Sequence, residues 1–188
     1  DARREFYKTN APAMDILVSS NLERLVWFMV NGDSEKVNKY MEELKETGVY
    51  KVDDETLARV QKEFKAGCLG EEDVLKVVHD CWNENKYLLD THTAVGYGVY
   101  EEYVKNTGDT TKTILLSTAS PYKFPESVYQ ALTGEEVDVY TAIEKLHDLT
   151  GMEISYPLKG IKDREILHKG VIDRDAILDT IAEKIKEY

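Results

Sequence analysis

Hydroxyl side chains, a proline and a lysine lie close together in residues 117–124, STASPYKF, directly after the apolar residues 113–116, TILL. Ser117 and Thr118 can each donate and accept a hydrogen bond. If residues 113–116 form a buried strand, these hydroxyls lie at its carboxyl end, where open α/β sheets bind ligands. A helix that starts at Pro121 would also present free backbone N–H groups, which favour anions. The stretch therefore indicates a small-molecule site.

A capping interpretation explains the same stretch without a ligand. Ser120 is a preferred N-cap residue, and Pro121 suits the first position of a helix. Lys123 is a candidate nucleophilic amine if it is buried, but a lysine near a helix start is more often solvated. Local spacing favours capping over ligand binding, and the two interpretations are compatible.

A carboxylate and an imidazole flank Thr91 in residues 88–100, LLDTHTAVGYGVY. Asp90 and His92 together could carry acid–base chemistry. The structural alternative is that Asp90 or Thr91 caps the helix that follows and that His92 packs at its start.

A third candidate is the stretch MDILVSSNLERL, residues 14–25, in which a helix start lies near Arg24. By itself this pattern is typical of a capped amphipathic helix with Arg24 on its solvent face. No cluster with metal-ligand spacing is found among the remaining histidines and the two cysteines: His79, His147, His168, Cys68 and Cys81.

Composition narrows the classes of partner. The 188 residues carry a formal net charge of −12, which repels phosphate backbones and anionic lipids, so neither nucleic acid nor a membrane surface is expected. A hydrophobic content of 42% is typical of a globular chain. No apolar run approaches the roughly 18 residues of a membrane span. The cysteine spacing indicates no disulfide framework, which predicts a reducing, cytoplasmic setting.

Helices must position these residues, because apolar side chains recur at helical spacing along most of the chain. Helices are predicted around residues 22–30, 37–44, 57–64, 71–82, 93–105, 125 onward, 139–149 and 176–185. Gly96 and Gly98 interrupt the fifth, which predicts close approach of a neighbour or ligand. Residues 113–116 are the clearest strand, and residues 15–18 are compatible with one. A buried strand needs neighbours, so either the sheet is minimal or its other strands lie upstream of Asp1.

Taken in order, the three candidate stretches resemble the C-terminal part of threonine synthases. The similar segments are residues 14–25, 90–94 (DTHTA) and 117–124, with FKAGC at 64–68 and YLLD at 87–90 between the first two. Thr91 stands where that family usually has proline, which leaves the helix start intact and makes the turn less rigid.

The resemblance implies an α/β protein of the fold-type II pyridoxal-phosphate group, mostly helical here with few parallel strands. Residues 1–188 would form the C-terminal part of the large cofactor-binding domain. The Schiff-base lysine and the glycine-rich phosphate loop are expected upstream, in the N-terminal remainder of the same enzyme. The complete enzyme is expected to convert O-phospho-L-homoserine and water to L-threonine and phosphate with pyridoxal 5′-phosphate as an electron sink. By itself the chain is expected to be inactive.

The resemblance also assigns roles to individual residues. Thr118 is expected to face the pyridine nitrogen, assisted by Ser117, and a neutral hydroxyl there bonds the ring without fixing a full positive charge on it. Asp90, His92 and Lys123 are substrate-site candidates. Lys123 does not replace the upstream lysine, so no catalytic residue and no metal ligand is expected within residues 1–188.

Two alternatives remain open. Another fold-type II lyase, such as a threonine dehydratase, shares the strand-end hydroxyl but not the SSNLER and D-x-H-T-A segments as they stand here. A non-catalytic helical interaction domain would show an exposed apolar patch and no cofactor pocket.

Overall fold

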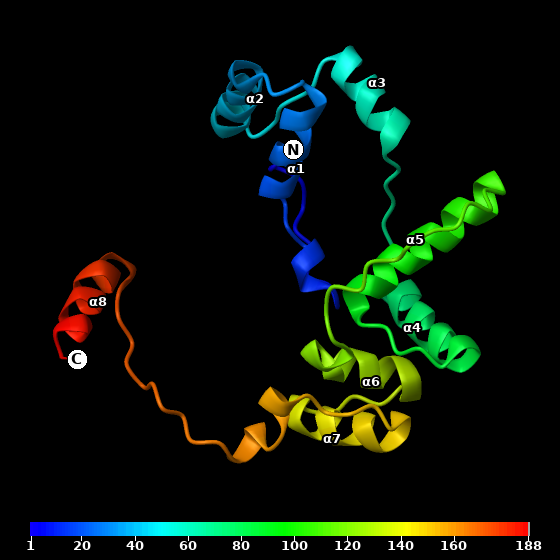
Figure 1. Cartoon of the computed structure of the whole chain (residues 1–188), viewed down its shortest axis with the longest axis vertical. Helices are drawn as coiled ribbons and strands as arrows, with labels where there is room; N and C mark the ends of the chain where they lie inside the picture. Colours follow the sequence, from blue (N-terminus) through cyan, green and yellow to red (C-terminus); the bar gives the residue numbers. More distant parts are fainter. Residues whose placement is uncertain (188) are drawn as a thin grey trace. The chain divides into compact units, whose positions relative to one another are not determined.

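Helices make up the regular structure of residues 1–187, the part of the chain that the computed structural model describes (Figure 1). The α-helices are α1 (Ser20–Met29), α2 (Ser34–Thr47), α3 (Asp54–Glu63), α4 (Glu71–Asn85), α5 (Thr91–Thr107), α6 (Pro125–Thr133), α7 (Val139–Thr150) and α8 (Ile177–Lys186). The short 3₁₀ helices are η1 (Pro12–Met14), η2 (Pro121–Lys123), η3 (Tyr156–Leu158), η4 (Ile161–Asp163) and η5 (Arg174–Ala176). Among residues 1–187, no helix combines the length and apolarity that crossing a bilayer requires.

Side-chain caps and left-handed glycines set the helix ends, as the sequence predicts. Backbone N–H groups at the helix starts donate to the N-cap carboxylates of Asp33, Asp53, Asp90 and Asp138. Glycines with positive φ follow α2, α5, α6 and α7, namely Gly48, Gly108, Gly134 and Gly151. Gly48 and Gly151 therefore end α2 and α7 in the left-handed conformation that glycine adopts most easily.

The predicted strand at residues 113–116 is wrong, and so is the possible strand at residues 15–18, because residues 1–187 contain no strand. Ile114 is 84% exposed and Leu116 is 76% exposed, whereas the prediction took both as buried. A strand forms only when a neighbouring segment takes its backbone hydrogen bonds, and no described residues do so here. The α/β class predicted from the sequence is therefore observed only in its helical part.

The chain divides into two compact units. In the first, Asp1–Glu153, α4 packs against α5 and α6, and α6 packs against α7. The side chains that these contacts bury completely are Val78, Ala94, Val128, Ala142 and Leu146. A smaller core between α1 and α2 contains Val26, Val30, Val37 and Tyr40.

Close contact between α4 and α5 requires a glycine in α5. A Cβ at Gly98 would lie 2.5 Å from Leu69 Cδ1 and 3.0 Å from Val77 Cγ2. The close approach predicted for the two glycines is thus confirmed at Gly98. At Gly96 the nearest atom, Leu115 Cδ1, is 3.7 Å away, an ordinary contact.

The second unit begins at Ile154 and contains η3 to η5 and α8. Residues 165–173 have no regular structure, and every one of them is exposed. On α8 no residue is buried, and Ile181 and Ile185 are 50% and 68% exposed.

Candidate functional site

The N-terminus of α5 is organised by the buried carboxylate of Asp90. Its Oδ1 accepts hydrogen bonds from the backbone N–H of His92 at 2.9 Å and of Thr93 at 3.3 Å. Thr91 is the first residue of α5 and is fully buried. The capping interpretation of Asp90 is therefore confirmed, and the carboxylate lies with no exposed side-chain surface.

His92 connects this helix start to two other segments. Its Nε2 accepts a hydrogen bond from the backbone N–H of Ala13 at 3.1 Å, and its ring lies 4.9 Å from that of Phe124, centroid to centroid. Its Nδ1 lies 3.3 Å from Asp90 Oδ1. Since Nε2 accepts, the proton of the neutral imidazole is on Nδ1, facing the carboxylate. His92 therefore packs at the helix start, as the structural alternative predicts.

The N-terminal segment is tied to the same region by further polar contacts. Asp15 accepts from both the amide and the hydroxyl of Thr9, at 2.8 and 2.6 Å. These two hydrogen bonds, with that from the hydroxyl the stronger, hold the pKa of the Asp15 carboxyl below its usual range. Asn10 contacts Glu71 at the start of α4 and Ser127 in α6. Sequence reasoning did not find these contacts, since they join residues far apart in the chain.

Two adjacent hydroxyls end the extended segment before η2, and they differ in their surroundings. The Ser117 Oγ lies 3.3 Å from the Oγ of Thr93, whose hydroxyl also bonds Asp90 Oδ2. Thr118 is exposed, and within residues 1–187 its hydroxyl has no hydrogen-bond partner. Successive residues of an extended segment point to opposite sides, so Ser117 and Thr118 face different directions.

A cavity of about 460 Å³ lies beside Ser117. Its walls combine apolar and aromatic side chains with hydroxyls, and include Trp82, Tyr87, Leu88, Ser120 and Thr150. Thr118 does not line it. Lys86, which sequence reasoning missed, lies at its edge with a left-handed φ of 55° and with its Nζ 5.6 Å from the Trp82 ring centroid.

Lys123 and Ser120 follow the capping interpretation. Ser120 Oγ accepts from the Tyr122 N–H at 3.2 Å and caps η2. Lys123 is exposed, with its Nζ 5.6 Å from the centroid of the Phe124 ring. The burial that a nucleophilic lysine would require is therefore not observed.

A larger hollow of about 810 Å³ forms where the N-terminal segment faces the loop before α4. Its lining includes Met14, Asp15, Ile16, Gly67 and Cys68, and Val95 of α5 closes it. Two of the segments that resemble threonine synthases, residues 14–25 and 64–68, thus meet at one surface. Periodicity could not reveal this, because both segments contribute loop residues.

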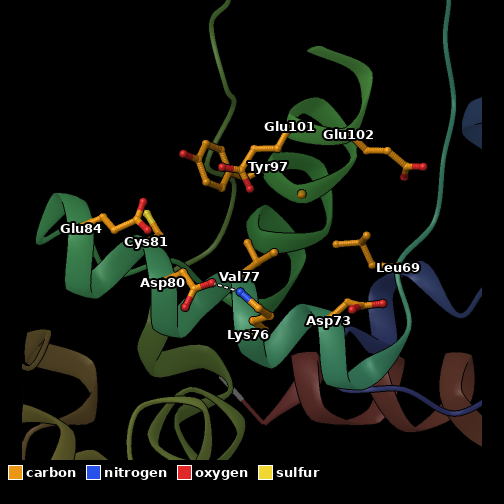
Figure 2. Close-up of a pocket in the computed structure, with 11 residues that line it drawn as sticks. Leu69, Asp73, Lys76, Val77, Asp80, Cys81, Glu84, Tyr97, Glu101 and Glu102 are labelled. Atoms are coloured by element: carbon orange, nitrogen blue, oxygen red, sulfur yellow. Dashed lines mark hydrogen bonds and ion pairs between the residues drawn. The ribbon is translucent and has the colours of Figure 1, made fainter. Parts of the chain in front are cut away.

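The groove between α4 and α5, shown in Figure 2, has a different character. Its carboxylates are Asp73, Asp80, Glu84, Glu101 and Glu102, and its lysine, Lys76, pairs with Asp80 and thereby lowers the pKa of that carboxyl. A phosphate ester would be repelled by this excess of negative charge. Among residues 1–187 no group of side chains could hold a metal ion. The negative charge of its carboxylates therefore disfavours the groove as a binding site for anions.

Comparison with known proteins identifies relatives of the chain. Residues 93–160 match the family model described as "Threonine synthase, C-terminal". Threonine synthase of Saccharomyces cerevisiae is 38% identical over 140 residues, which cover 67% of this chain and 27% of that protein. Human threonine synthase-like 2 is 31% identical over 137 residues, covering 72% of this chain and 28% of the relative.

The chain is also similar to a solved structure. The crystal structure of PLP-bound threonine synthase from Brucella melitensis matches with a TM-score of 0.62 and 30% sequence identity. The match covers 85% of this chain and 34% of that one. The chain spans about a quarter of the length of the curated relatives described above.

Proposed function

Because the chain belongs to the threonine synthase family, we propose that it supplies the C-terminal part of a pyridoxal-phosphate-dependent enzyme. The proposed reaction converts O-phospho-L-homoserine and water to L-threonine and phosphate, a carbon–oxygen lyase reaction acting on phosphate. The observation that carries the proposal is the convergence, at the start of α5, of the stretches 90–94 and 117–124 with the residue directly before the stretch 14–25. His92 contacts Ala13 and Phe124 there. Thr93 contacts Asp90 and Ser117.

The hydroxyls of this region fit one end of the cofactor ring. A pyridine nitrogen needs a hydrogen-bond partner that is accessible and not already engaged. Thr118 is exposed, and none of residues 1–187 engages its hydroxyl, so it meets both conditions. The cofactor, when bound, supplies an electron sink for carbanions, and in this proposal Thr118 donates to the ring nitrogen without imposing a full positive charge.

The remaining parts of the site are proposed to come from the rest of the same enzyme, since the chain spans about a quarter of its relatives' length. Asp90 and His92 then hold the wall of the site together rather than exchange protons, because both lie in contacts with the protein itself. We also propose a cytoplasmic setting. The net charge of −12 supports a protein with neither nucleic acid nor a membrane surface as a partner.

The test is made in the complete protein with pyridoxal 5′-phosphate and O-phospho-L-homoserine, following release of phosphate and threonine. Thr118→Asp is expected to shift the absorbance of the bound cofactor and to lower turnover at least tenfold, or about 1.4 kcal/mol of the activation barrier, because a carboxylate would hold the ring nitrogen protonated. Thr113→Asp, which changes an exposed threonine of the same segment, is the matched control. Equal kinetics for the two variants would show that Thr118 is not part of the site.

Substrate choice separates the proposal from its alternatives. A threonine dehydratase would consume threonine and leave O-phospho-L-homoserine unchanged. A non-catalytic domain would show no rise in melting temperature with pyridoxal 5′-phosphate. The exposed apolar side chains of α8, among them Ile181 and Ile185, fit that second alternative.

A further inference from the structure

The hydroxyl of Thr93 lies between a buried carboxylate and the edge of the candidate site. Thr93 is 4% exposed and Asp90 is 1% exposed. The Thr93 Oγ bonds Asp90 Oδ2 on one side and lies 3.3 Å from Ser117 Oγ on the other. The chain of contacts Asp90–Thr93–Ser117 thus runs from the cap of α5 to the residue that lines the 460 Å³ cavity.

The number of protons fixes the direction of these hydrogen bonds. A carboxylate can only accept, and the Oδ1 of Asp90 already receives two backbone N–H groups. The single proton of Thr93 therefore goes to Asp90 Oδ2. The Ser117 hydroxyl must then donate its own proton to Thr93, which leaves Ser117 with lone pairs only on the side that faces a ligand.

We propose that Thr93 is a positioning residue that holds the Ser117 proton inward, so that Ser117 can only accept a hydrogen bond from a ligand while Thr118 remains free to donate. The identity of the ligand as a pyridine ring rests on the proposed function, whereas the hydrogen-bond direction does not. The two neighbouring hydroxyls then have separate tasks. Thr118 donates to an unprotonated ring nitrogen, and Ser117 accepts from an N–H or O–H group.

A side-chain contact of the same segment supports this arrangement. Leu115 approaches Gly96 of α5, with its Cδ1 3.7 Å from the position of a Cβ there. Leu115 is accordingly less exposed, at 39%, than either neighbour. The segment is thus held against α5 two residues before Ser117, which brings Ser117 to Thr93.

A double-mutant cycle on the complete protein without cofactor tests the contact. Thr93→Val and Ser117→Ala are each expected to lower the ratio of folded to unfolded protein, measured by urea unfolding. Combining them should cost about three- to tenfold less than the product of the single effects, because both remove one hydrogen bond. Thr93→Ser keeps the hydroxyl and should keep the coupling. Ser120→Ala, at a serine whose Oγ bonds Tyr122 instead, should show no coupling with Thr93→Val.

Additive effects of Thr93→Val and Ser117→Ala would overturn the proposal. If Thr93→Val does not fold, because it leaves Asp90 Oδ2 buried without its donor, Ser117→Ala alone decides. An unchanged unfolding equilibrium in that variant would show that the hydrogen bond to Thr93 does not form.

The direction of the bonds is tested with pyridoxal 5′-phosphate labelled with ¹⁵N in the ring. Thr118→Val should move the ring-nitrogen resonance of the bound cofactor, and Ser117→Ala should not. The opposite result would show that Ser117 donates. If the complete protein binds no pyridoxal 5′-phosphate but the coupling is present, the proposed function fails and the role of Thr93 stands. If the protein binds pyridoxal 5′-phosphate but Thr93 and Ser117 show no coupling, the role of Thr93 fails and the proposed function stands.

Discussion

Gly98 and Gly96 lie two residues apart on α5 and meet different neighbours. A methyl group at Gly98 would collide with Leu69 and Val77, whereas one at Gly96 meets an ordinary contact. Helix propensity by itself would favour alanine over glycine at either position by about 1 kcal/mol. Gly98 itself is buried, and a methyl group there would require both Leu69 and the β-branched Val77 of α4 to shift, which we expect to outweigh that gain.

Gly98→Ala is therefore expected to destabilise the protein by about 1 kcal/mol or more. Its matched control, Gly96→Ala, should stabilise it by up to about 1 kcal/mol. Urea unfolding of the two variants measures the sign of each change in stability. If both substitutions raise stability, Leu69 and Val77 do not pack on Gly98 as described.

The sequence predicts the site residues in part. Capping by Asp90 and Ser120 follows from residue type and spacing, and both are observed. The sequence predicts no role for Thr93, because a threonine in the first turn of a helix does not by itself indicate a functional residue. Its importance arises from Ser117, 24 residues later, and such a contact exists only once the chain has folded. The roles expected of Thr118, Asp90, His92 and Lys123 remain predictions.

At the level of elements, the link between α2 and α3 depends on one carboxylate. Asp53 caps α3 by accepting from the Thr56 N–H at 2.9 Å, and its Oδ2 is 2.6 Å from Lys36 Nζ and 2.7 Å from Tyr40 Oη. The ion pair with Lys36, followed by the hydrogen bond from Tyr40, holds the pKa of Asp53 well below its usual range.

This arrangement makes the stability of the protein depend on pH in the acidic range. A depressed folded-state pKa means that the stabilisation is fully present above the unfolded-state pKa of about 3.9 and is lost as the pH falls towards the lower folded value. Asp53→Asn removes this contribution. The wild type should therefore lose its advantage in melting temperature over Asp53→Asn as the pH is lowered from about 6 to 2. A constant difference over that range would contradict the assigned pairing.

Helices were more predictable than the strand because they satisfy their own backbone hydrogen bonds. The N-cap Asp53 and the glycine stops at Gly48 and Gly151 are local signals, and each is observed. Residues 113–116 have strand-forming side chains, but a strand also depends on partners that local sequence cannot report. Phe64, which directly follows α3, is 46% exposed, whereas Thr56 of α3 is buried and its hydroxyl bonds Asp53.

At the scale of the whole molecule, the second unit is the part with the least buried surface. Residues 165–173 are exposed throughout and have no regular structure. Limited digestion with trypsin should therefore cut first after Lys169, since proteases cleave exposed segments that can adapt to their active sites. Lys145 on α7, which pairs with Glu135, is the internal control and should be cut later. Early cleavage at Lys145 would contradict the packing of α7 against α6.

The contact between Asn10 and Ser127 joins residues 117 positions apart. During translation Asn10 is made long before α6, and at the usual rate of roughly 5–20 residues per second the delay lasts roughly 6 to 23 seconds. The early helices α1 and α2 can form their own small core in that interval, because their contacts are local. The segment before them gains its partners in stages, Glu71 and His92 first, and its set of contacts is completed only when the nascent chain reaches Ser127 of α6.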